Sequence, residues 1–123
     1  MTGGGGAGEI INARGQRNEQ AAHLQRAEWI DLSGPIGPGK WGGLALLDHP
    51  GNLNHPTGWH CRNDGWAGAA FNMEQPYTLK PGATLRLRYR IHLHRHDAAA
   101  GEVARRYEEY RAKPVVQLGE ALR

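Results

Sequence analysis

The stretch from Leu85 to Leu93 alternates apolar and polar side chains almost without a break, which is typical of a β-strand. Leucine, tyrosine and isoleucine occupy the odd positions, whereas arginine and histidine occupy the even ones. Just before this stretch, Pro81 presets the backbone for the second position of a type II turn, and Gly82 supplies the positive φ that must follow. We therefore expect a hairpin in which residues 77–79 pair with residues 83–93.

Three more strands are indicated by short apolar or alternating runs. They cover residues 9–13, residues 22–32 with a bulge, and residues 41–47. Ser33–Gly34–Pro35 is expected to end the second of these strands, and the polar residues 14–20 are expected to form a loop. With 18 glycines and seven prolines the chain suits tight turns better than a helical bundle.

One helix is expected near the C-terminus. Asp97 can cap a helix over residues 98–112 by accepting a hydrogen bond from a free first-turn amide. Val103, Tyr107 and Tyr110 are spaced i, i+4 and i+7, so they form a stripe that packs on the sheet. The expected organisation is a flexible glycine-rich lead-in (1–8), one domain (9–114) and a tail (115–123).

Residues 48–72 show little periodicity and are dense in Gly, Pro, Asn, His and Trp, which predicts a long ordered loop. Histidines with carboxylates suit acid–base chemistry near neutral pH, while amide and guanidinium donors with indole faces suit a sugar ring. The candidate catalytic residues are Asp48, His49, His60 and Asp64. The candidate ligand-binding residues are Asn52, His55, Trp59, Arg62 and Trp66. His55 is also a candidate acid–base or orienting group. The alternative is a rigid loop in which prolines fix the turns and polar side chains bond the backbone.

His92 and His94 share a face of the predicted strand with three arginines. The positive charge disfavours a metal there and suits an anionic ligand such as a uronate; the alternative, which we expect, is a solvated outer face. Cys61 is the only cysteine and is expected to be a buried structural thiol, since His60 beside it would point to the opposite face of an extended segment. No residues are assigned to a metal, and the cofactor is left open.

Charge and hydropathy limit the partners. The net charge is +3, but acidic residues are interleaved with the arginines, which argues against nucleic acid. The longest aliphatic run, residues 44–47, is far shorter than the ~20 residues that span a bilayer. No signal peptide is visible, so a cytoplasmic location is the default expectation, unless a truncated start has removed an export signal.

Residues 29–35, 45–52, 55–60 and 81–90 together resemble a bacterial family named "methane oxygenase PmoA-like". The resemblance covers residues 8–114 and implies a β-sandwich related to sugar-binding supersandwich proteins, occurring in polysaccharide-degrading bacteria. It also implies that this chain matches only the C-terminal half of its relatives, so the sandwich would be incomplete and would leave strand edges free for self-association. The oxygenase activity is not carried over, because such a subunit is embedded in a membrane.

Three hypotheses follow. The first is a carbohydrate-associated β-sandwich that binds or modifies a sugar through the histidine, aspartate and tryptophan side chains of residues 48–66, which would face a common hollow. The second is a metal-dependent oxidase or oxygenase that uses the loop histidines. The third is a non-catalytic fragment with no activity of its own.

Overall fold

The computed structural model describes residues 8–112, and within them the chain forms seven strands and two helices. The elements in chain order are β1 (Glu9–Asn12), α1 (Asn18–Ala22), β2 (Gln25–Arg26), β3 (Trp29–Gly37), β4 (Lys40–Asp48), β5 (Gly58–Arg62), β6 (Trp66–Ala70), β7 (Tyr89–Arg95) and α2 (Val103–Ala112). The expected lead-in and tail lie almost wholly outside the described residues. No helix among the described residues is long and apolar enough to cross a membrane.

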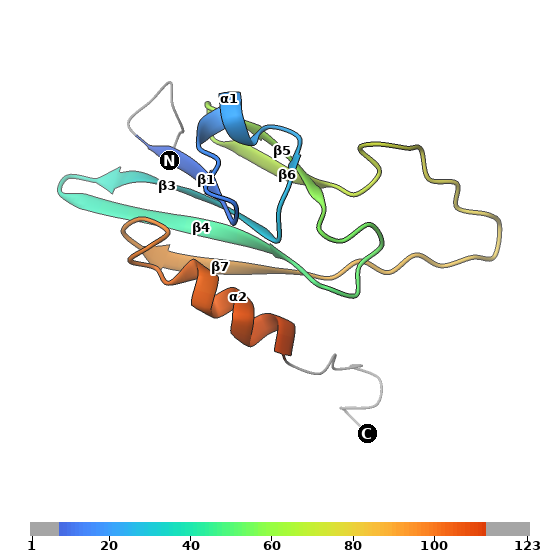
Figure 1. Cartoon of the computed structure of the whole chain (residues 1–123). Helices are drawn as coiled ribbons and strands as arrows, with labels where there is room; N and C mark the ends of the chain where they lie inside the picture. Colours follow the sequence, from blue (N-terminus) through green and yellow to red (C-terminus); the bar gives the residue numbers. More distant parts are fainter. Residues whose placement is uncertain (1–7, 113–123) are drawn as a thin grey trace.

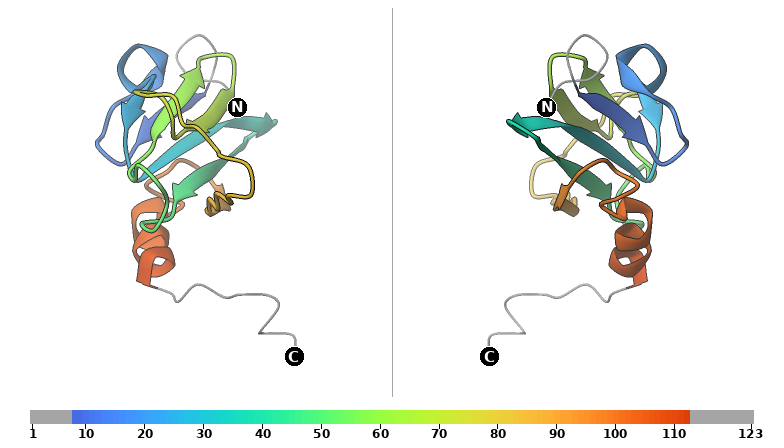
Figure 2. Two further views of the ribbon diagram at one scale, coloured as in Figure 1. Left: turned by 90° about the vertical axis from the view of Figure 1, so that its right-hand side faces the viewer. Right: turned by 90° about the vertical axis from the view of Figure 1, so that its left-hand side faces the viewer.

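Two antiparallel sheets form the protein, as expected for a mainly β fold. The larger sheet has the order β1-β3-β4-β7 and the smaller has the order β2-β5-β6. In Figures 1 and 2 the smaller sheet lies over one face of the larger sheet and α2 lies against the other face. The larger sheet is therefore the middle layer of three, and neither sheet closes into a barrel.

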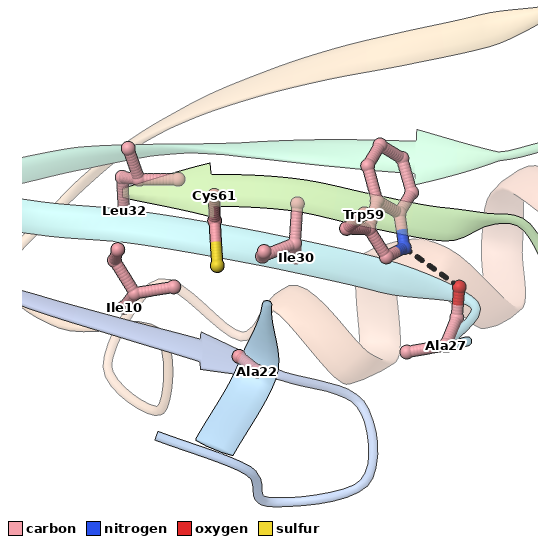
Figure 3. Packing of buried hydrophobic residues seen from close by; sticks show 7 residues of the cluster. All are labelled: Ile10, Ala22, Ala27, Ile30, Leu32, Trp59 and Cys61. Atoms are coloured by element: carbon pink, nitrogen blue, oxygen red, sulfur yellow. Dashed lines mark hydrogen bonds between the residues drawn. The ribbon is translucent and has the colours of Figure 1, made fainter. Parts of the chain in front are cut away.

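Each face of the larger sheet carries its own apolar cluster. Between the two sheets lie Ile10, Ala22, Ala27, Ile30, Leu32, Trp59 and Cys61, which come from β1, α1, β3, β5 and the β2–β3 connection and are drawn in Figure 3. Between α2 and the larger sheet lies a second cluster, made of Ala45, Leu47, Ala98, Val103, Tyr107 and Tyr110. The expected stripe of α2 is confirmed, because its three members are all buried. The expected burial of Cys61 is confirmed as well.

The second expected strand is different in the structure. Residues 18–22 form the short helix α1, partly where a loop was expected, and the expected strand 22–32 is divided between β2 and β3. β3 does not end at residues 33–35 but continues to Gly37. β1 pairs with β3 only as far as Ser33, so beyond that residue β3 has a partner, β4, on one side only. Pro35 lies in this part of β3, where the missing backbone N–H of a proline is tolerated.

The expected long loop contains two strands. β5 and β6 form a hairpin within residues 58–70, joined by a turn in which Gly65 has φ +95°. β5 does alternate, since Trp59 and Cys61 are buried while His60 and Arg62 are not. The strand is only five residues long, and it is flanked by Gly, Pro and Asn residues, so its alternation of buried and exposed side chains is not evident in the sequence.

The hairpin expected at residues 77–93 is only partly present. Its turn is confirmed, because Gly82 has φ +81° and the Ala83 N–H donates to the Lys80 carbonyl at 3.0 Å. The two sides do not pair, and residues 71–88 instead form an extended arm that reaches away from the body in Figure 1. A two-stranded ribbon with no layer to pack on is marginal in water, which accounts for the open form.

The helix α2 begins later than expected. The Ala100 N–H donates to the Asp97 side chain at 2.9 Å, so Asp97 does cap a turn. Glu102 then has a positive φ of 54°, and regular helix starts only at Val103.

Candidate functional site

Asp48, the last residue of β4, is fully buried and fixes the residues that follow it. Its Oδ1 accepts a hydrogen bond from the Asn52 amide at 2.7 Å. Its Oδ2 accepts the Thr57 N–H at 3.0 Å and lies 2.6 Å from His55 Nδ1. A carboxylate only accepts, so Nδ1 of His55 carries the proton and donates. Three donors thus hold residues 48–57 against the end of the sheet.

His55 is occupied on its other nitrogen too. Nε2 lies 3.4 Å from the hydroxyl of Tyr107, which is buried in α2. Burial, followed by the negative charges of Asp48 and Glu28, raises the pKa of Tyr107 to about 12, so the phenol stays protonated and donates to Nε2. An imidazole bonded on both sides cannot take a proton from a substrate unless Tyr107 moves. The hydrogen bonds that join Asp48, His55 and Tyr107 therefore fix β4, the loop that follows it and α2 to one another.

Asn52 ties the same loop to the base of the arm. Its Nδ2 donates to the Arg88 carbonyl at 2.6 Å and its Oδ1 accepts the Arg88 N–H at 2.7 Å. His49 lies beside it, with Nδ1 accepting the Gly51 N–H at 2.9 Å and its ring edge-on to Tyr110 at 5.4 Å. The side chains of Asn52 and His49 thus serve the backbone, as the rigid-loop alternative describes.

All the other predicted residues except Trp59 lie on a different surface, the outer face of the β5–β6 hairpin and its turn. Arg62 pairs with Trp66 across the strands, and its guanidinium lies 3.2 Å from Asp64. The ring centroid of His60 lies 4.9 Å from that of Trp66, at an interplanar angle of 83°. The sequence did not single out His23. Its ring centroid lies 4.7 Å from that of His60, at an interplanar angle of 81°. We call the rings of His23, His60 and Trp66 the ring platform.

The ring platform ends in an open face. Trp66 has 58% of its surface exposed, whereas His60 is only partly exposed. Gly68 pairs with His60, and nothing lies within 4 Å of the place where its Cβ would be, so a shallow open floor adjoins the rings. Nδ1 of His60 is buried and has no hydrogen-bond partner among the described residues. The platform combines a flat apolar surface with one buried ring nitrogen that has no partner among the described residues.

The structure contradicts the stacking role expected for Trp59. Its side chain is fully buried between the sheets, and its indole N–H donates to the Ala27 carbonyl at 2.8 Å (Figure 3). The nine predicted residues therefore do not share one hollow. One group surrounds Asp48, a second lies on the ring platform face, and Trp59 belongs to the core.

A buried pair that the sequence did not predict lies under α2. Nε2 of His94 on β7 is hydrogen-bonded to Oδ1 of Asp31 on β3. The His94 side chain is only 3% exposed, so the solvated face expected for β7 is wrong at this position, although Arg90 on the same face is exposed. Burial raises the pKa of Asp31 to about 6, although the hydrogen bond from His94 acts to lower it. Oδ2 of Asp31 and Oγ of Ser33 have no partner among the described residues.

Partners 63 residues apart cannot be matched from sequence spacing. The available signal was a carboxylate between Ile30 and Leu32 in an apolar strand. Within residues 8–112, no three His, Cys, Asp or Glu side chains are arranged to hold a metal ion.

A family of unknown function, DUF6807, matches residues 3–108. No curated protein and no solved structure matches the chain. The resemblance to a PmoA-like family is thereby corrected, since nothing points to that family, and the view of the chain as the C-terminal half of such relatives goes with it. The matched range covers most of the chain, which therefore belongs to the family of unknown function DUF6807.

Proposed function

We propose that this protein binds carbohydrate and that a sugar ring lies on Trp66. The observation that carries the proposal is the ring platform, in which the His60 ring contacts an exposed indole and the His23 ring in turn contacts His60. An indole supplies a large flat apolar surface, and a side chain already held by its neighbours loses little freedom when a ligand binds. Such a surface is suited to the apolar face of a pyranose.

Polar groups for the sugar hydroxyls lie beside the ring. The Arg62–Asp64 pair offers guanidinium donors and carboxylate acceptors, and both side chains are more than half exposed. Gly68 leaves the adjoining floor open. A ligand site with an apolar base and a few convergent polar groups is the usual arrangement.

A binding role fits the described residues better than catalysis at the predicted loop. Asp48 and His55 are occupied by each other, by Asn52, by Thr57 and by Tyr107. The metal-dependent oxidase alternative has no ligand set in residues 8–112 to which it can be assigned.

The test is a titration of the full chain with maltohexaose, cellohexaose and a homogalacturonan oligosaccharide, preceded by a glycan array. We expect at least one glycan to shift the NMR signals of the Trp66 indole and the Gly68 amide. Trp66→Ala should weaken that binding at least tenfold, while Trp66→Phe should retain most of it, because it keeps a flat ring.

Leu53→Ala is the matched control, since Leu53 is also an exposed apolar side chain. That variant should bind like the parent. No response to any glycan, or a response that Trp66→Ala leaves unchanged, would show that the ring platform is not a sugar site.

A further inference from the structure

In β7 the polar face is covered by other parts of the chain, whereas the apolar face is open to solvent. Its polar side faces α2 and the preceding turn, where His94 is buried and His92 Nε2 lies 3.1 Å from the Gly101 carbonyl. Its apolar side is open, with Ile91 63% and Leu93 73% exposed. A regular strand normally buries its apolar side first, so a covering layer is missing from β7.

The open surface continues across the sheet. Leu44 pairs with Leu93 and Leu46 pairs with Ile91, and both β4 leucines are only partly buried. The smaller sheet covers the neighbouring positions on β3 and reaches Leu46, and Trp59 contacts Tyr89 at the start of β7, but Ile91 and Leu93 remain exposed. We call Leu44, Leu46, Ile91, Leu93 and Ile36 the apolar strip. Contiguous exposed apolar surface of this kind marks interaction sites.

Ile36 joins the strip from the irregular end of β3, where the pairing with β4 shifts register. Its Cδ1 would lie 3.0 Å from a Cβ placed on Gly42, so the Ile36 side chain covers that glycine on the open side of the sheet. Gly42 pairs with Arg95, which brings the end of β7 to the same place.

The strip borders an unpaired strand edge. β7 is the last strand of its sheet, it is seven residues long, and no described strand pairs with its outer side. An edge strand presents a row of backbone donors and acceptors, which an extended peptide can use to add a strand.

A positively charged cavity lies at the Arg95 end of the strip. Its volume is about 440 Å³, and it is lined by Ile36, Lys40, Trp41, Arg95 and His96, with Gly39 at the turn. Neither Lys40 nor Arg95 forms a salt bridge with a described carboxylate. The indole N–H of Trp41 is buried and has no acceptor within the described chain. A carboxylate would satisfy these groups.

We propose that β7 accepts an extended segment of another protein, with alternating apolar residues that cover the apolar strip and an acidic residue that enters the Lys40–Arg95 cavity. Charge complementarity favours this occupant over a second copy of the chain. β7 carries arginine and histidine but no carboxylate, so a second copy pairing through β7 would bring no acidic group to the cavity. The added strand supplies both the missing backbone partner and the missing apolar layer.

The test uses a designed peptide, acetyl-Glu-Ile-Thr-Val-Thr-Ile-Glu-amide, and two analogues with lysine or glutamine in place of both glutamates. A glutamate at each end lets either strand direction place an acid in the cavity. We expect the first peptide to shift the NMR signals of the β7 amides and the Trp41 indole N–H. It should bind at least tenfold more tightly than the lysine peptide at low salt, and less tightly in 0.5 M NaCl.

Three variants connect the result to the surface. Lys40→Gln combined with Arg95→Gln should remove the preference for the glutamate peptide. Leu93→Gln should weaken the binding of all three peptides at least fivefold. Leu53→Gln, at an exposed leucine elsewhere, should bind like the parent.

Equal affinity for the three peptides, or no amide shifts at millimolar peptide, would overturn the proposal. So would sedimentation that shows a dimer whose contacts include the β7 amides, because a second copy would then be the occupant. Trp66→Ala should leave peptide binding unchanged, so this test stands apart from that of the ring platform.

Discussion

Asp31, the third residue of β3, lies between two apolar neighbours and is fully buried. Besides His94, the groups that act on its pKa are Glu9 and His92, which lie on the same side of the sheet. Because desolvation outweighs the hydrogen bond from His94, the folded chain holds a proton on this carboxyl up to about pH 6. An unfolded aspartate loses the same proton near pH 4.

This difference predicts a pH dependence of stability. Between about pH 4 and about pH 6 the folded state binds more protons at Asp31 than the unfolded state does, so this residue's contribution to the free energy of unfolding falls as the pH rises. A shift of about two units corresponds to at most about 3 kcal/mol. The ¹³Cγ signal of Asp31 should titrate near pH 6, and Asp31→Asn should remove this component from urea unfolding measured at pH 4 and 7.

Asp64→Asn is the control, since Asp64 is exposed and should leave the pH slope as it is. A midpoint below pH 4.5 for Asp31 would contradict the prediction.

At the scale of single residues, the sequence predicted burial where the side chain alone decides it. Cys61 and the α2 stripe are apolar or weakly polar, and both are buried as expected. Trp59 was misplaced because an indole suits a core and a ligand site equally well. Its location depends on which side of β5 it occupies, and β5 itself was not recognised.

The arm and β7 meet at Arg88, whose backbone N–H and carbonyl are both bonded to the side chain of Asn52. Asn52→Ala would remove two hydrogen bonds to Arg88 and one to Asp48. We expect the free energy of unfolding to fall by about 1–3 kcal/mol, because buried backbone groups lose their partners. Hydrogen exchange should quicken at the Arg88 amide and in the adjoining part of the arm.

Asn54→Gly provides the comparison from the same loop. Asn54 is exposed, has a φ of 60° that glycine adopts without strain, and donates one hydrogen bond to the Phe71 carbonyl. The Asn54→Gly substitution should lower the free energy of unfolding by less than about 1 kcal/mol. An equal effect at both positions would argue against a special role for Asn52.

At the scale of elements, the sequence predicted β1 and β4 close to their bounds, placed the strand that became the nine-residue β3 too early, and missed the shortest elements. β4 and β7 each have seven or more residues and were expected close to their observed bounds, apart from the unpaired start of the second. α1 and β5 have five residues each, and β2 has two. Elements this short are fixed by contacts with the larger sheet, and their local period is too brief to show this.

The whole molecule depends on one sheet with an apolar cluster on each face. Because β3 and β4 contribute to both clusters, loosening either face should weaken the same transition. We expect Ile30→Val and Val103→Ala each to lower the free energy of unfolding by about 1 kcal/mol. Urea curves from far-ultraviolet circular dichroism and from tryptophan fluorescence should coincide in both variants.

A different result would be informative. If α2 melted before the fluorescence changed in Val103→Ala, the two faces would unfold separately, and the sheet would not act as a single unit.

The two edges of the larger sheet are not equivalent, and this limits how the protein can assemble. At β1 the chain closes its own edge: the Ile10 N–H donates to the Asn18 side chain at 3.0 Å and the Asn12 N–H donates to the Gln16 carbonyl at 3.1 Å. At β7 no described segment does the same. This sheet can therefore lengthen at one end only, so a strand that docks there terminates growth and no fibre can propagate through it.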